Sequence, residues 1–405
     1  MHECVCRSTF PLHKDDKSEF SMATLTFPVP AQTIVEKKRS FYRPELDVLR
    51  FFAFLAVFLY HFNHPAEFYV QHGIPRAIAA GAASLIEGGV FGVDLFFVLS
   101  AYLITELLLR EKEACGSLDV KGFYLRRILR IWPLYFFAIG LALVPAFNPG
   151  HVFNWRYAAA FLLLAGNWSI IAYGWPIHSI GGVLWTVSIE EQFYLLWPPI
   201  VRKISRNRIA GTAIAMLILS SAMRVLMIVI HGGMNSVWCN TLARLDPIAM
   251  GILVAAALRG RIPNFSIGTR LGMLCCGILP LAFVATRWKI HEPETLEWIP
   301  TLVGFPVVAV SCTLILLAAL GISTRPHGVF LYLGKISYGL YVYHPLGNLL
   351  SGKIIPVHTG FVQLALRPTV ALAITIVLAA TSYAVLETPF LKLKKRFAHI
   401  HSRPV

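Results

Sequence analysis

The stretch LDVLRFFAFLAVFLYHFNH, residues 46–64, is the first long apolar run of this chain, and it contains two basic side chains, Arg50 and His61. A transmembrane helix needs about 20 mainly apolar residues, so this stretch can cross a membrane. An arginine inside such a helix costs roughly 2.5–3.5 kcal/mol on insertion scales, and ionisable residues kept at that cost usually have a function. Arg50 and His61 are therefore candidate functional residues.

The overall composition indicates a membrane protein. Of the 405 residues, 56% are hydrophobic and 14% are charged, which is more apolar surface than one soluble core of this size buries. The formal net charge of +15 comes from short blocks of Lys and Arg between apolar runs, where basic loops set the topology, so no nucleic-acid partner is predicted. The seven cysteines have neither metal-type nor disulfide-type spacing, and no metal site is predicted.

Further apolar runs recur along the chain. With the first, they cover residues 46–64, 88–109, 131–147, 157–173, 183–201, 209–230, 241–258, 269–286, 299–320, 330–350 and 366–386. Three of them lie between the basic segments 110–130 and 202–208, both expected in the cytoplasm, and a return to the same side takes an even number of crossings. Run 157–173 is short and leads into a segment with glycines and a proline, so it is the one predicted not to cross.

The predicted fold is an all-α polytopic membrane protein with about ten transmembrane helices, one re-entrant segment and both termini in the cytoplasm. Residues 1–40 are predicted to be a disordered cytoplasmic tail, residues 41–397 the membrane domain, and residues 398–405 a short cytoplasmic tail. Met22 is an alternative start, because no structural pattern precedes it.

This topology brings several polar residues to a similar depth. At 1.5 Å and about 100° per residue, Arg50 and His61 lie about 16 Å apart along the first span and on one face of it. Other spans carry polar residues in their outer halves or at their outer ends, and these are Asp94, Glu190, Glu191, Arg244, Asp246 and His344. Ser100 is expected nearer the middle of its span. We therefore predict one polar chamber built from several helices around a lipid-embedded bundle.

Simpler roles are open for single members of this set. Asp47 and Arg50 stand at i,i+3 and can neutralise each other. His344, which precedes Pro345, can satisfy the polar groups of a helix end.

A second basic group, Arg126, Arg127 and Arg130, lies on the cytoplasmic side. These residues can fix the topology as a positively charged stop. They can also bind phosphate, because guanidinium groups contact phosphate oxygens in pairs. Their spacing does not decide between the two roles.

Six segments then occur in a distinctive order. They are YRPELDVLRFFAFLAVFLYHF, GVDLFFVLSAYLIT, FYLRRILRIWPLY, LWTVSIEEQFYLLWP, ISYGLYVYHPL and SYAVLETPF. In this order, over about residues 41–397, they resemble the integral-membrane acyltransferases of the acyltransferase-three family. The resemblance implies a ten-helix domain in the bacterial cytoplasmic membrane that transfers an acyl group, usually acetyl from cytoplasmic acetyl-CoA, to a hydroxyl of a carbohydrate or glycosylated acceptor. Acyl-CoA is then a substrate, and no permanently bound cofactor is expected.

The resemblance also implies roles for single residues. The residues that match family positions are Arg50 and His61 (an essential pair), Arg127 and Arg130 (an Arg-x-x-Arg motif that contacts CoA), and Glu190 and Glu191 (a Glu-Glu-Gln-Phe signature). We add Arg126 and Ser100 on the CoA side. The usual Ser-Gly-Phe reads Ser100-Ala101-Tyr102 here, which puts the shape of the acyl or acceptor channel in question. No hydrolase-like segment follows Arg396, so the domain is expected to act alone or with a partner protein.

The expected chemistry is general-base catalysis on an activated thioester. His61 either takes the proton of the acceptor hydroxyl or is acylated first, and the sequence leaves both routes open. Glu190, Glu191 or Asp94 is expected to orient its imidazole, as the acid of a catalytic triad does, with His344, Arg244 and Asp246 in support. Two rival hypotheses are a proton-coupled transporter or flippase that uses the same histidines and acids as a relay, and an acyl-sensing scaffold without catalysis.

Overall fold

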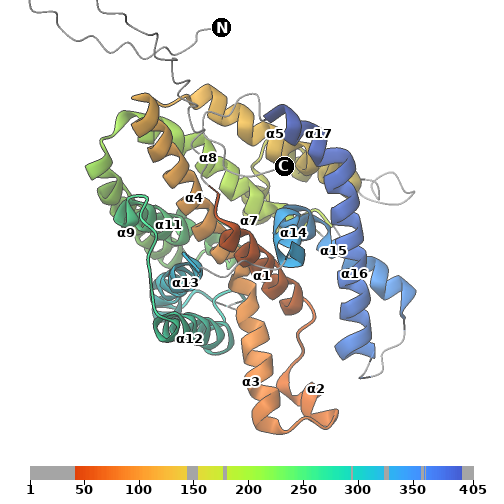
Figure 1. Cartoon of the computed structure of the whole chain (residues 1–405). Helices are drawn as coiled ribbons and strands as arrows, with labels where there is room; N and C mark the ends of the chain where they lie inside the picture. Colours follow the sequence, from red (N-terminus) through yellow and green to blue (C-terminus); the bar gives the residue numbers. More distant parts are fainter. Residues whose placement is uncertain are drawn as a thin grey trace, which may run out of the picture. The chain divides into compact units, whose positions relative to one another are not determined.

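The computed structural model describes residues 42–143, 154–176, 180–292, 295–322, 328–356, 360 and 362–394. Throughout these residues the regular structure is helical, and they contain no β-strand (Figure 1). The two predicted tails, 1–40 and 398–405, lie outside them. Five helical segments of the described chain are long and apolar enough to cross a membrane, namely Arg76–Cys115, Arg206–Val229, Ile267–Trp288, Trp298–Ala319 and Val362–Lys394. The prediction of an all-helical, multi-pass chain is confirmed in this coarse form.

Most helices overlap the apolar runs of the sequence, but Ala66–Gln71, Arg76–Glu87 and Thr388–Lys394 are helical outside all of those runs. In the first half of the chain they are α1 (Pro44–Tyr60), α2 (Ala66–Gln71), α3 (Arg76–Glu87), η1 (Gly88–Phe91), α4 (Gly92–Cys115), α5 (Val120–Leu143), α6 (Trp155–Leu162), α7 (Gly166–Tyr173), η3 (Gly182–Leu184) and α8 (Trp185–Lys203). In the second half they are η4 (Arg206–Arg208), α9 (Ile209–Val229), α10 (Asn235–Trp238), η5 (Leu242–Arg244), α11 (Leu245–Leu258), α12 (Ile267–Phe283), η6 (Val284–Trp288), α13 (Trp298–Ala319), α14 (Gly328–Lys335), α15 (Ser337–Ile354), η7 (Val362–Leu366), α16 (Arg367–Ser382), η8 (Tyr383–Glu387) and α17 (Thr388–Lys394).

Helix α1 separates the two basic residues of the opening stretch, with Arg50 in its first half and His61 just after its last residue. Pro44 occupies the first turn, where its fixed φ and missing N–H are tolerated, and Glu45 and Asp47 in the same turn interact favourably with the helix dipole. Arg50 lies one turn further on. The helix ends at Tyr60, and His61 is its C-cap residue, so the histidine side chain emerges where the helix stops.

Run 157–173, which was predicted not to cross, is divided between two short helices. α6 and α7 have eight residues each, and Leu164 between them has a positive φ of 58° that no helix continues through. Eight residues span about 12 Å, against a hydrocarbon thickness of about 30 Å. Neither helix is therefore long enough to cross a membrane alone.

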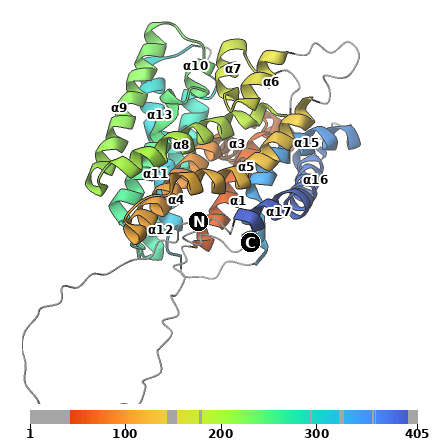
Figure 2. The ribbon, with the colours of Figure 1, turned by 90° about the horizontal axis from the view of Figure 1, so that it is seen from above.

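Helix α4 lies at the centre of the helix packing. It contacts α1, α8, α11 and α13, and Figure 2 shows α4 next to α8 and α11. Gly251 of α11 faces α4 so closely that a Cβ at this position would meet the Val98 carbonyl and come within 2.9 Å of the Ala101 Cβ. Ala101 and Tyr102 are both buried. The departure from the usual Ser-Gly-Phe therefore affects the packing of α4 against α11, as small residues do at membrane-helix contacts.

We expect Gly251→Ala to destabilise the protein by about 1–3 kcal/mol, because the added methyl overpacks the contact between α4 and α11. Thermal unfolding of the purified protein in detergent measures this as a lower midpoint. Gly272→Ala is the matched control, since a Cβ at that position of α12 meets nothing within 4 Å. Equal midpoints for the two variants would contradict the proposed packing.

Candidate functional site

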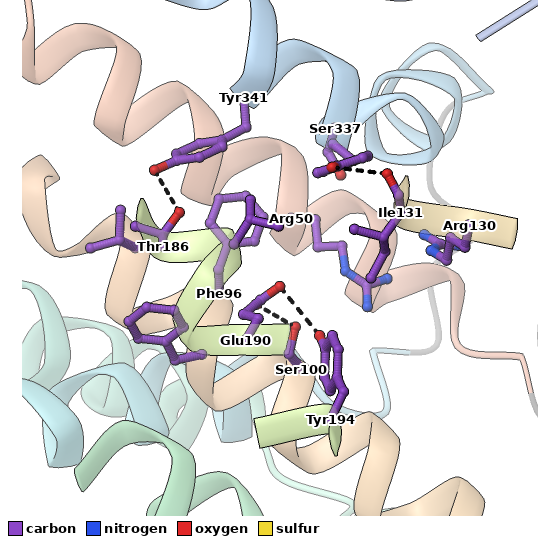
Figure 3. A pocket seen from close by; sticks show the side chains of 14 residues that line it. Arg50, Phe96, Ser100, Arg130, Ile131, Thr186, Glu190, Tyr194, Ser337 and Tyr341 are labelled. Atoms are coloured by element: carbon purple, nitrogen blue, oxygen red, sulfur yellow. Dashed lines mark hydrogen bonds between the residues drawn. The ribbon is translucent and has the colours of Figure 1, made fainter. Parts of the chain in front are cut away.

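Three cavities follow one another through the helices, and we name each after one residue that lines it. The Lys394 cavity is lined by Tyr42, Arg43, Leu46, Asp47, Arg50, Leu103, Leu107, Arg127, Arg130 and Lys394. The Arg50 cavity (Figure 3) is lined by Arg50, Val93, Phe96, Phe97, Ser100, Arg130, Ile131, Thr186, Val187, Glu190, Tyr194, Ser337, Tyr338 and Tyr341. The His61 cavity is lined by Val57, Tyr60, His61, Val90, Val93, Trp175, Val183, Trp185, Met234, Trp238, His291, Glu292 and Tyr341.

Shared lining residues fix the order of the three cavities. Arg50 and Arg130 line both the Lys394 cavity and the Arg50 cavity. Val93 and Tyr341 line both the Arg50 cavity and the His61 cavity. The Arg50 cavity is therefore the middle one, and the two ends of α1 open toward different members of the series.

The Lys394 cavity is strongly basic. Its lining includes four arginines and one lysine, Arg43, Arg50, Arg127, Arg130 and Lys394, against a single carboxylate, Asp47. That carboxylate accepts a hydrogen bond from Arg50 Nη1 at 3.0 Å, as the i,i+3 spacing suggested. Sequence reasoning missed Arg43 and Lys394. These two residues lie near the first and last residues of the membrane domain in the sequence. The only sequence signal for a role in the site is that each belongs to a basic segment.

The three neighbouring arginines of α5 face different surroundings. Arg127 lies over the ring of Tyr194 at 5.1 Å and lines the Lys394 cavity together with Arg130. Arg126 Nη2 instead donates to Glu111 Oε2 at 2.8 Å, and Arg126 is absent from the lining of all three cavities. Consecutive helix residues point about 100° apart, and here the turn directs Arg126 to Glu111 and Arg127 to the Lys394 cavity.

The two neighbouring glutamates of α8 also diverge. Glu190 lines the Arg50 cavity and accepts hydrogen bonds from Ser100 Oγ at 2.8 Å and Tyr194 Oη at 3.3 Å (Figure 3). Glu191 accepts from the indole N–H of Trp132 at 3.1 Å and is not among the residues that line the three cavities.

Asp94 is bound elsewhere, in a fully buried group of two ion pairs. Both Asp94 carboxylate oxygens accept from Arg244 Nη2 at 2.9 Å. Asp246 is paired with Arg224 at 2.5 Å. The guanidinium of Arg244 also stacks on Trp238 at 4.2 Å. Each buried charge thus has a partner, which is the arrangement that burial requires.

The expected orientation of His61 by an acid is therefore not found. Glu190, Glu191 and Asp94 all have other partners, and no hydrogen bond to the His61 side chain is found among the described residues. The depth of these acids follows from the sequence, but the direction in which each side chain points depends on how the helices pack.

The neighbour of His61 is His344. The two imidazole rings are stacked, with centroids 5.1 Å apart and planes 29° apart. His344 is buried, and its Nδ1 lies 2.6 Å from the Tyr341 carbonyl, which can only accept, so Nδ1 carries the proton. Its Nε2 is then an acceptor, and it has no hydrogen-bond partner in the described residues. The predicted grouping of His61 with His344 is thus present in this structure.

Aromatic side chains form much of the remaining wall of the His61 cavity. Trp175 lies edge-to-face with Trp185 at 6.2 Å, and Trp185 is 6.1 Å from Trp238. Sequence analysis did not select these residues, because tryptophans near membrane boundaries are common. The described residues contain no group of three or more His, Cys, Asp or Glu that could hold a metal ion.

Comparison with known proteins finds matches that cover most of the chain. The family model described as an acyltransferase domain matches residues 43–386. O-acetyltransferase OatA from Staphylococcus aureus strains NCTC 8325 / PS 47, COL and MRSA252 is in each case 30% identical over 383 residues, covering 87% of this chain and 57% of the relative. The chain thus spans little more than half the length of these curated relatives. No solved structure matches it.

We expect Arg244→Met to destabilise the protein by about 3–5 kcal/mol, because it leaves the buried Asp94 carboxylate without its partner. The double variant Arg244→Met with Asp94→Asn should recover much of this loss, since no unpaired charge is left. Thermal unfolding in detergent measures both variants. A single variant as stable as the native protein, or a double variant no better than the single one, would show that this ion pair does not hold α4 against η5.

Proposed function

Because the chain belongs to the acyltransferase-three family of membrane acyltransferases, we propose that it transfers an acyl group, acetyl from acetyl-CoA, to a hydroxyl of a carbohydrate or glycosylated acceptor. The name O-acetyltransferase carried by its relatives supports acetyl as the acyl group. The observation that carries the proposal is the series of three cavities, joined by shared lining residues, from a cation cluster to His61.

The Lys394 cavity is the proposed site for the nucleotide part of CoA. The nucleotide part of CoA carries several phosphate groups, and the five cations of the cavity provide the complementary charge. Arginine binds phosphate through paired N–H donors, and such charge-assisted hydrogen bonds are about twice as strong as neutral ones. Arg127 and Arg130 are the first choice for these contacts, because neither makes a hydrogen bond or an ion pair within the described residues.

The Arg50 cavity is the proposed path of the thioester arm. It adjoins the Lys394 cavity at Arg50 and Arg130, and it leads toward the His61 cavity at Tyr341. Its wall combines apolar side chains with polar groups, which are Arg50, Arg130, Glu190, Ser100, Thr186, Ser337 and three tyrosines. Arg50 would meet the pantetheine amides or the carbonyl oxygen of the thioester on which negative charge develops.

His61 is the proposed base or acyl carrier of the reaction. In the direct route the acceptor oxygen attacks the thioester carbon while His61 takes the hydroxyl proton; a C–O bond forms, the C–S bond breaks, and the proton passes to the leaving thiolate. In the alternative route a His61 nitrogen attacks the thioester carbon first, so that a C–N bond forms, the C–S bond breaks and the CoA thiolate leaves. The acceptor oxygen then attacks the acyl carbon, the C–N bond breaks, and the hydroxyl proton passes to the thiolate. In either route His344 would position the His61 ring by stacking, since no acid within the described residues is hydrogen-bonded to the imidazole of His61.

The proposed orientation has ten spans, with both termini and the Lys394 cavity on the cytoplasmic side of a bacterial membrane. It is supported by the way two basic segments meet at one end of the bundle. Lys112 Nζ donates to the carbonyls of Val201 and Ile204 at 2.8 and 2.7 Å, and Glu113 pairs with Arg206. Basic loops gather in the cytoplasm in multi-pass proteins.

A transporter would use the same cavities without releasing CoA. The direct test is therefore chemical: purified protein in detergent, supplied with acetyl-CoA and a mixture of glycans, should release free thiol and yield glycans heavier by one acetyl group. Vesicle transport of a glycan without thiol release would favour the transporter.

We expect His61→Ala to lower acetyl transfer by at least about 100-fold, because removing a general base costs about 10²–10⁴ in rate. Membrane insertion and acyl-CoA binding should be unchanged, since His61 lies outside the Lys394 cavity. His231→Asn, a change at an exposed histidine outside all three cavities, serves as control. Retained transfer by correctly inserted His61→Ala protein would remove His61 from the chemistry.

We expect Arg127→Gln and Arg130→Gln each to weaken acyl-CoA binding tenfold or more, because one charged hydrogen bond contributes about 1.5–3 kcal/mol. Binding of acyl-CoA to detergent-purified protein, followed by isothermal calorimetry, measures this. Arg126→Gln is the matched control, because Arg126 is bound to Glu111 and lies outside the cavity. If all three variants weaken binding equally, the Lys394 cavity is not the phosphate site.

A further inference from the structure

We propose that the His61 cavity is the acceptor subsite and that it selects an uncharged sugar ring over one that carries a carboxylate. Trp175 would provide the surface on which the ring packs, and Glu292 and His291 would bind its hydroxyl groups. This inference rests on the proposed function, which requires a hydroxyl compound beside His61.

The charges of the His61 cavity carry the selectivity. Its ionisable lining consists of Tyr60, His61, His291, Glu292 and Tyr341, so in the described residues no Lys or Arg lines it. The two cations of the neighbouring loop, Arg287 and Lys289, are exposed and are not among the lining residues. Among the described residues, a sugar carboxylate in this cavity would face Glu292 without a Lys or Arg as counter-charge, and like charges brought together across an interface repel each other.

Trp175 has the properties of a fixed stacking surface. Its side chain is 41% exposed although it lines the cavity, and its indole N–H donates to Asn235 Oδ1 at 3.1 Å. The ring of Trp185 supports it edge-to-face. A sugar ring has apolar C–H faces and a polar rim, and a tryptophan held in place offers a large apolar surface without losing much conformational freedom on binding.

Two polar groups beside this surface still have hydrogen-bonding capacity. Glu292 Oε1 accepts from Tyr60 Oη at 3.1 Å, whereas its Oε2 has no partner in the described residues. His291 is 4% exposed, and its Nε2 lies 3.0 Å from Glu87 Oε1, a carboxylate that also accepts from Asn63 Nδ2 at 2.6 Å. Its Nδ1 is buried without a partner in the described residues. Because a buried nitrogen without a hydrogen-bond partner is unfavourable, the His291 Nδ1 indicates a place for a ligand hydroxyl.

These groups line the same cavity as His61, so a ring held by Trp175 would present its hydroxyls to the proposed base. Apolar surface combined with a few converging polar groups is the usual construction of small-molecule sites. The Lys394 cavity is lined by cations, whereas the His61 cavity has Glu292 and no Lys or Arg in its described lining. The anionic donor and the neutral acceptor are therefore expected at opposite ends of the series.

The test uses full-length protein in detergent and matched glycosides as probes. Neutral methyl glycosides of glucose, galactose and N-acetylglucosamine are compared with ring analogues that carry a carboxylate. We measure the acceptor KM with acetyl-CoA in excess, the inhibition constant of any glycoside that is not acetylated, and, independently of turnover, glycoside binding by saturation-transfer NMR. We expect neutral glycosides to bind about tenfold more tightly, a difference of about 1.4 kcal/mol.

Three variants test the residues. Trp175→Ala should raise the acceptor KM about tenfold and leave the KM for acetyl-CoA unchanged, as expected for the loss of one aromatic anchor. Trp155→Ala is the matched control, because Trp155 is 66% exposed on α6 and lines none of the three cavities; it should change neither constant. Glu292→Gln should reduce the preference for neutral rings to less than about threefold, because it removes the like charge.

The outcomes separate this inference from the proposed function. The subsite is overturned if acetyl transfer prefers acidic rings, or if Trp175→Ala changes transfer no more than Trp155→Ala does. Either result leaves the proposed acyltransferase activity standing. Trp175-dependent binding of neutral rings without any thiol release supports the subsite and overturns the proposed reaction. If no glycoside is bound and none is acetylated, both the subsite and the proposed reaction are overturned.

Discussion

A charged side chain among apolar helices needs a counter-charge or water, since leaving it alone is unfavourable by several kcal/mol, and this constraint organises the whole structure. The protein satisfies it in two ways. Arg224 and Arg244 are sealed against Asp246 and Asp94, and these pairs hold α4, α9, α11 and η5 together without reaching a cavity. Arg127 and Arg130 instead line cavities and make no hydrogen bond or ion pair within the described residues, which leaves their guanidinium groups available for an anionic ligand.

The same division separates stability from chemistry on single helices. On α5, Arg126 is tied to Glu111 while Arg127 faces the Lys394 cavity. On α8, Glu191 is held by Trp132 while Glu190 faces the Arg50 cavity. Adjacent residues of like charge thus serve different purposes because a helix turns them about 100° apart.

The sequence predicted the helices well and the side-chain partners only in part. Long apolar runs locate helices because a helix that crosses a membrane needs about 20 apolar residues. In the short run 157–173 the structure breaks the helix at Leu164, where φ is positive. Depth predicted that His61 and His344 lie in the same region, but it did not predict the stacking of their rings. The pairing of Asp94 with Arg244, rather than with His61, did not, because it depends on the packing of α4 against η5. Arg43 and Lys394 were missed because residues so far apart in sequence meet only in the folded chain.

The central claim is that an acyl-CoA enters at the Lys394 cavity and reaches toward His61 through the Arg50 cavity. The most direct measurement is a cryo-electron microscopy structure with a non-hydrolysable thioether analogue of acetyl-CoA. The account predicts phosphate density beside Arg127 and Arg130 and the acetyl end in the Arg50 cavity or beyond it, toward Tyr341. Density for the nucleotide at the Trp175 end, or outside the three cavities, would contradict it.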